Sequence, residues 1–194
     1  MNDTVSLANN ASEEMMVDEF TSLGTAILTA TFLIFIVMAM QFESPRFSIM
    51  VMTTIPFSLI GSFGLLFLFN EPISMVSLLG FLILIGTVVN NGILYVDTVN
   101  QLKDDMSLKE AVVEAGVIRM RPIFMTTLTT VVAMIPMALG YGDSGEMLQG
   151  LALVDVGGLI ASTVLALLML PVYYLVMSGK PTKRRKTLKD KIFE

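Results

Sequence analysis

The chain has no cysteine and no histidine, and these absences exclude several kinds of site. Without them there can be no disulfide framework, no usual zinc centre and no thiol or imidazole catalyst. Charged residues make up only 15% of the 194 residues, against about 25% in a soluble domain. Hydrophobic residues make up 54%, and the mean hydropathy is +0.76. This composition predicts an all-α membrane protein that is not an enzyme and has no cofactor.

Five apolar segments are long enough to cross a hydrocarbon layer of about 30 Å as helices. Together they predict one transmembrane domain over residues 21–177. The connection after the third segment contains Ser107 followed three residues later by Glu110, the pattern of a helix capping box. Apolar residues recur on one face behind Ser107, so we expect a short amphipathic helix at the interface over residues 107–118. The five segments cover residues 21–40, 47–69, 73–96, 122–139 and 151–177.

Basic residues are distributed unevenly along the chain. Five crossings place all twelve on one side of the membrane, which the positive-inside rule makes cytoplasmic. The acidic N-terminal segment, residues 1–20, is expected outside as polar chain with a helix beginning after Ser12, and it lacks the pattern of a signal peptide. Residues 178–194 form a basic cytoplasmic tail that favours lipid headgroups over nucleic acid. The basic residues are Arg46, Lys103, Lys109, Arg119, Arg121, Lys180, Lys183, Arg184, Arg185, Lys186, Lys189 and Lys191.

Polar side chains within the apolar segments are the candidate functional residues. Asn90 and Asn91 lie deep in the third segment, where an amide needs a hydrogen-bonding partner. Asn90 and Thr126 have similar predicted depths, so a contact between their antiparallel helices is expected, with Arg119 reaching toward the same layer. Asp155, four residues from the outer end of its predicted segment, is expected to reach the interface. These residue types fit either helix packing or a transport pathway.

Small residues indicate where helices approach closely. Gly86, Gly157, Gly158 and Ser162 are the candidate packing residues, and the last three belong to pairs with the small-xxx-small spacing. The sixteen methionines could suggest transport of a soft metal, but methionine is also a common filler of apolar packing. We therefore expect no metal site.

Four stretches of the sequence resemble a known transporter family, and the match runs in order from residue 13 to residue 177. The chain is similar here to the resistance–nodulation–division (RND) efflux pumps. The resemblance implies that the five segments are helices eight to twelve of a twelve-helix transporter in the bacterial inner membrane. It also implies a homotrimer that exports amphiphilic substrates in exchange for protons, with a possible periplasmic adaptor protein. The stretches are AMQFESPRFSIMV (39–51), GTVVNNGILYVDTVNQ (86–101), EAGVIRMRPIFMTTLTTVVAMIPMALG (114–140) and GGLIASTVLALLMLPVYYL (157–175).

The same resemblance assigns roles to particular residues. It implies that Asn90, with Asn91 beside it, occupies the proton-relay position of the tenth helix, and that Arg119 and Thr126 are the relay residues of the eleventh. Drug pumps of the family carry lysine where this chain has Asn90. The relay aspartates of the fourth helix and the external substrate domains have no counterpart here. The sequence thus predicts the C-terminal membrane half of a pump, inactive without its N-terminal half. The alternative is a small self-standing membrane protein that assembles with or regulates a full transporter.

Overall fold

The computed structural model describes residues 2–42, 45–142 and 145–177, and these residues contain helices and no strand. Five stretches are long and apolar enough to cross a membrane, with α2 and α3 forming one of them. The all-α class and the five spans are therefore confirmed. The predicted basic tail, residues 178–194, lies outside the described residues. The helices are α1 (Asn2–Gln41), α2 (Pro45–Met52), α3 (Thr54–Phe69), α4 (Met75–Leu102), α5 (Leu108–Ala138) and α6 (Gly145–Met177).

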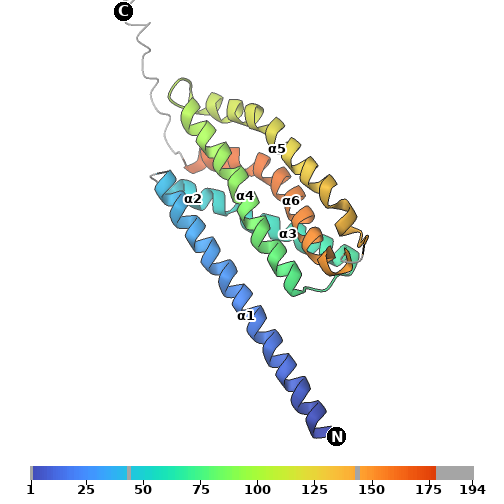
Figure 1. Cartoon of the computed structure of the whole chain (residues 1–194). Helices are drawn as coiled ribbons and strands as arrows, with labels where there is room; N and C mark the ends of the chain where they lie inside the picture. Colours follow the sequence, from blue (N-terminus) through green and yellow to red (C-terminus); the bar gives the residue numbers. More distant parts are fainter. Residues whose placement is uncertain (1, 43–44, 143–144, 178–194) are drawn as a thin grey trace, which may run out of the picture.

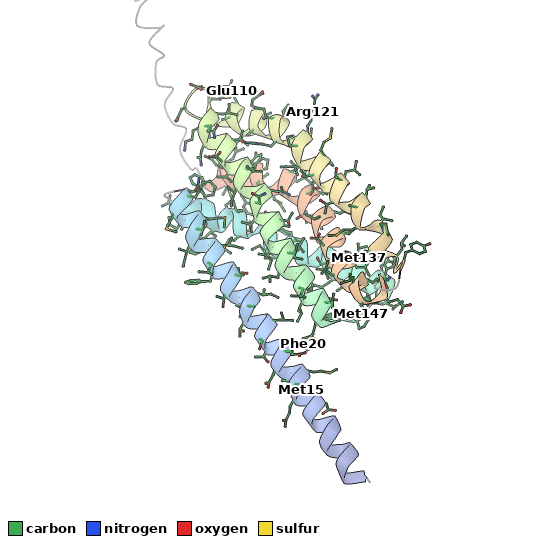
Figure 2. The ribbon with its side chains drawn as sticks, viewed as in Figure 1. Met15, Phe20, Glu110, Arg121, Met137 and Met147 are labelled. Atoms are coloured by element: carbon green, nitrogen blue, oxygen red, sulfur yellow. The ribbon has the colours of Figure 1, made fainter. Side chains whose placement is uncertain are left out.

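Helix α6 is the centre of the bundle and packs against α2, α3, α4 and α5. Helix α4 contacts α1 and α5 and lies between them in Figure 1. The structure shows that α1 begins at Asn2, whereas the predicted helix begins only after Ser12. Its first part projects beyond the bundle, where Met15 and Phe20 stand clear of the other helices in Figure 2. No proline or glycine precedes Gly24, so the local sequence contains no strong helix breaker.

The predicted single span over residues 47–69 is divided into α2 and α3 at Thr53. Pro56 explains the division, because a proline ring collides with the carbonyl four residues earlier, and Met52 is the last residue of α2. The Thr53 hydroxyl donates to the Met50 carbonyl at 2.6 Å, so it bonds a backbone group beside the break. The span therefore crosses the bundle as two short helices.

The amphipathic helix predicted at residues 107–118 is not a separate element, because it forms the first part of α5. The capping box itself is confirmed. The Ser107 N–H donates to Oε2 of Glu110 at 3.1 Å, and the Glu110 N–H donates to Oγ of Ser107 at 3.4 Å. Helix α5 then continues through the membrane-spanning stretch to Ala138 (Figure 2).

The apolar face of this first part packs on protein rather than on the membrane interface. Ala111, Val112 and Ala115 are fully buried in a cluster with the last turns of α4. The Tyr95 hydroxyl of α4 donates to the Val112 carbonyl at 3.1 Å. Because the face finds an apolar partner within the bundle, the segment stays in line with the rest of α5 instead of turning along the interface.

Candidate functional site

The two adjacent asparagines of α4 point in different directions. Asn90 is exposed and Asn91 is partly buried, because neighbouring residues of a helix lie about 100° apart. The exposed positions around Asn90 recur every three or four residues and form one narrow stripe along the helix. We call this stripe the open face of α4; its residues are Leu79, Ile83, Gly86, Asn90 and Leu94.

The open face is apolar except at Asn90. No side-chain hydrogen bond of Asn90 is present among the described residues, and none of the six helices covers the stripe. An amide left against hydrocarbon would forfeit its hydrogen bonds, which costs several kcal/mol on water-to-alkane scales, about 4–8. The Asn90 amide therefore requires a partner from beyond these helices.

The expected contact between Asn90 and Thr126 is absent from the described part of the chain. The Thr126 hydroxyl donates instead to the Ile123 carbonyl of its own helix at 3.0 Å. Arg119 does not reach the layer of Asn90 either, because its Nε donates to Oγ1 of Thr98 at 2.5 Å. Thr98 lies about two turns beyond Asn90 along α4. Arg119 thus joins α5 to α4, at a level away from the asparagines.

A different threonine of α5 makes a hydrogen bond to another helix at membrane depth. The hydroxyls of Thr127 in α5 and Thr163 in α6 lie 2.9 Å apart, and both residues are buried. The sequence analysis selected Thr126 from its predicted depth and from the resemblance to RND pumps. Depth does not separate adjacent residues, and the helix face that meets α6 decides which of them is buried.

A small cavity of about 10 Å³ lies beside Asn91, between α4, α5 and α6. This is about the volume that the centre of one water molecule needs, and such a water binds where two to four polar partners converge. The lining supplies them, since Asn91, Tyr95, Ser162 and Thr163 all border the cavity. Asn91 therefore faces the interior of the bundle, whereas Asn90 faces away from it.

Of the four predicted packing residues, Gly157, Gly158 and Ser162 lie between helices and Gly86 does not. A Cβ added to Gly157 would lie 2.5 Å from the carbonyl oxygen of Gly61, so α3 and α6 meet backbone to backbone there. A Cβ at Gly158 would collide with the Leu84 side chain of α4. Ser162 is buried and bonds the Leu159 carbonyl at 3.1 Å. At Gly86 an added Cβ would meet nothing within 4 Å. Gly86 therefore packs against no other helix in the described part of the chain.

Asp155 is buried, contrary to the expectation that it reaches the interface. The helix that carries it begins at Gly145, earlier than the predicted boundary, and Asp155 lies about three turns inside it. Only 2% of its surface is exposed, and Oδ1 has no hydrogen-bond partner. The described residues contain no group of three or more acidic side chains placed to hold a metal ion.

The model of the AcrB/AcrD/AcrF family matches residues 7–178, which is most of the chain. The chain belongs to this family. Its membership confirms the resemblance to RND transporters and makes the protein a multi-pass membrane protein of the RND efflux type.

Relatives of this AcrB/AcrD/AcrF family member are much longer than the chain itself. The swarming motility protein SwrC of Bacillus subtilis is 38% identical over 187 residues, which are 95% of this chain and 18% of SwrC. The multidrug resistance protein MdtC of Erwinia tasmaniensis is 40% identical over 153 residues, 78% of this chain and 15% of MdtC. The chain thus spans less than a fifth of the length of these relatives.

Solved structures that resemble this chain are also much longer than it is. The crystal structure of a heavy metal efflux pump (crystal form II) superposes with a TM-score of 0.75 and 31% identity, covering 85% of this chain and 16% of the pump. In crystal form I of such a pump the TM-score is 0.71 and the identity 29%. The arrangement of α1 to α6 is therefore that of part of an RND membrane domain.

Proposed function

We propose that this chain forms the C-terminal membrane part of a proton-driven RND transporter that exports amphiphilic compounds, and that it has no enzymatic activity. The main observation behind this proposal is the open face of α4. This face is apolar and uncovered, and Asn90 is its only amide. Family membership and the short coverage of longer relatives support a piece of a larger domain. The multidrug relatives favour amphiphilic substrates.

In this proposal the open face packs against the N-terminal half of the transporter, which places an acidic side chain opposite Asn90. An amide both donates and accepts hydrogen bonds. Its NH₂ group can donate to an ionised carboxylate, and its carbonyl oxygen can accept from a protonated one. Asn90 could therefore form a hydrogen bond with the carboxyl group in both of its protonation states, through the NH₂ group in one and through the carbonyl oxygen in the other. The membrane potential, about 2.3 kcal/mol per charge and 100 mV, then acts on the proton rather than on a charge of α4.

The other relay residues have graded roles. Thr126 is exposed on α5. It lies one turn from Ile123, and Ile123 borders the same cavity as Asn91, the neighbour of Asn90. Thr126 and Asn90 therefore lie at similar depths. We assign Thr126 to the relay beside Asn90. Arg119 is a positioning residue that sets the spacing of α4 and α5 through Thr98. Asn91 holds a water in the cavity and so fixes the rotation of α4, which aims Asn90 outward.

The assembly follows the same proposal. The N-terminus lies outside and the C-terminus in the cytoplasm of a bacterium with the protein in its inner membrane, since all basic residues then face the cytoplasm. The complete transporter is a homotrimer that works with an adaptor protein.

Transport by the full-length transporter containing this chain tests the proposal. The transporter is reconstituted in vesicles with an imposed proton gradient, and export of a fluorescent amphiphile is followed. Asn90→Leu should abolish proton-coupled export while the protein still assembles. Ile83→Leu, on the same open face, is the matched control and should export normally. Equal export by both variants would reduce Asn90 to a packing residue. Co-purification of the chain with a separate, complete transporter would favour the alternative, a regulatory membrane protein.

A further inference from the structure

The proposed relay does not use Asp155, although it is the most deeply buried acidic residue among those described. It is 2% exposed, and its Oδ1 has neither a hydrogen-bond partner nor contact with solvent. By contrast Glu146, an acidic residue of the same helix, is exposed. The burial of Asp155 is internal to this chain, because the helices that surround α6 all belong to it.

Among the residues that the structure describes, no cation is placed to neutralise a charge on Asp155. Gly80 of α4 packs against Leu151 and Val154, so Asp155 lies at the level of Gly80. The titratable residues of α4 and α5 are about four turns away, at the other end of the bundle. Helix α3 contains no titratable residue. The charged and titratable groups of the surrounding elements are Arg46 in α2, Tyr95 and Asp97 in α4, Lys109, Glu110, Glu114, Arg119 and Arg121 in α5, and Glu146, Tyr173 and Tyr174 in α6, with Glu71 in the turn after α3.

The Oδ1 atom of Asp155 is closed to solvent. The helices also pack tightly at this level, since an added Cβ at Gly80 of α4 would come within 3.0 Å of the Leu151 carbonyl of α6. A charge in such a place must be paired, hydrated or removed. Oδ1 is neither paired nor open to solvent among the described residues, whereas a proton bound to the carboxyl needs no cavity.

We propose that Asp155 is a proton-binding site within α6, separate from the relay position at Asn90, and that its carboxyl carries a proton while α3, α4 and α5 are closed around α6. Protonation converts the side chain into a neutral group with one O–H donor. The site can release that proton only when the helices packed around α6 open to water. Proton exchange at Asp155 thus reports movement of α6 against its neighbours.

Infrared spectroscopy of the 194-residue chain in phosphatidylcholine vesicles tests this inference, and the relay aspartates of a full transporter cannot interfere there. An exposed aspartate has a pKa of about 3.9, so at about pH 7 only a buried, protonated carboxyl should contribute a carboxylic-acid C=O band. The band should be present in the wild-type chain and disappear in Asp155→Asn. It should remain in Glu146→Gln, the matched control, and in Asn90→Leu, which separates this result from the fate of the proposed relay.

A band that survives in Asp155→Asn, or no band in the wild-type chain, would show that Asp155 is ionised and would overturn the inference. Loss of the wild-type band on adding sodium chloride at constant pH would also overturn it, since the site would then take a cation. If Asp155→Asn does not fold, isotopic labelling of aspartate carboxyls in the wild-type chain replaces it. The band should then shift in frequency, and an unshifted band would exclude an aspartate.

Discussion

The close contact between α3 and α6 at Gly157 leads to a quantitative prediction. In Gly157→Ala, the new Cβ would lie 2.5 Å from the carbonyl oxygen of Gly61 and 3.1 Å from Cγ of Leu65. Optimal contacts between such atoms lie at about 3.5–4.0 Å. The obstacle at Gly61 is backbone, so it cannot rotate away, and α3 and α6 must separate by on the order of 1 Å.

The matched control is Gly86→Ala on the open face of α4, where an added Cβ meets nothing. Both substitutions replace glycine by alanine within a helix, so the gain in helix propensity, about 1 kcal/mol, cancels between them. The difference that remains is the overpacking cost, about 1–3 kcal/mol. We therefore expect Gly157→Ala to be less stable than Gly86→Ala by this amount.

The absence of cysteine provides the assay. Ser62 is buried at the contact between α3 and α6, and its hydroxyl donates to the Val154 carbonyl at 2.7 Å. A Ser62→Cys background places one thiol there with little change of shape, and the rate of its modification in lipid measures how often the two helices separate. A difference of 1–3 kcal/mol corresponds to modification about 5–150-fold faster in Gly157→Ala than in Gly86→Ala. Equal rates in the two variants would refute the reasoning that the glycine contact holds α3 against α6.

Three further predictions concern single polar contacts. In the full transporter, Thr126→Val should reduce export less than Asn90→Leu, because the Thr126 hydroxyl already bonds its own helix and water can replace it; initial transport rates compare the two. Thr98→Val should lower the free energy of unfolding by about 1 kcal/mol, because it removes the acceptor of Arg119, whereas Thr98→Ser should keep it. Tyr174→Phe should also cost about 1 kcal/mol, because the bond from its hydroxyl to Oδ1 of Asn100, 2.7 Å long, is lost. Thermal unfolding in detergent measures both.

Each of these predictions has a clear contrary result. Export lost equally in Thr126→Val and Asn90→Leu would place the hydroxyl at the centre of the relay. A Thr98→Ser variant as unstable as Thr98→Val would show that the methyl packing of Thr98 matters rather than its bond to Arg119. In Tyr174→Phe the ring remains stacked on Phe47, with centroids 5.1 Å apart in the parent chain. Unchanged stability of Tyr174→Phe would show that the stacking of the ring, and not the hydrogen bond to Asn100, stabilises the contact.

Local chemistry explains which predictions from sequence were correct. The capping box of Ser107 and Glu110 depends on residues three apart, and it formed as predicted. Apolar length alone decides whether a segment can cross a membrane, and five spans are present. The apolar face of residues 107–118 was also predicted correctly, but its partner was not. Whether such a face meets lipid or α4 depends on where a distant helix lies.

The sequence by itself determined the membrane class, the spans and the family, because these depend on apolar runs, caps and motifs that are local in the chain. Only the tertiary structure decided which polar residues face inward. It separated Asn90 from Asn91, chose Thr127 rather than Thr126 as the partner of Thr163, and buried Asp155. The physical reason is that lipid is as apolar as a protein interior. Both faces of a membrane helix are therefore hydrophobic, and the periodicity that marks the inner face of a soluble helix is lost.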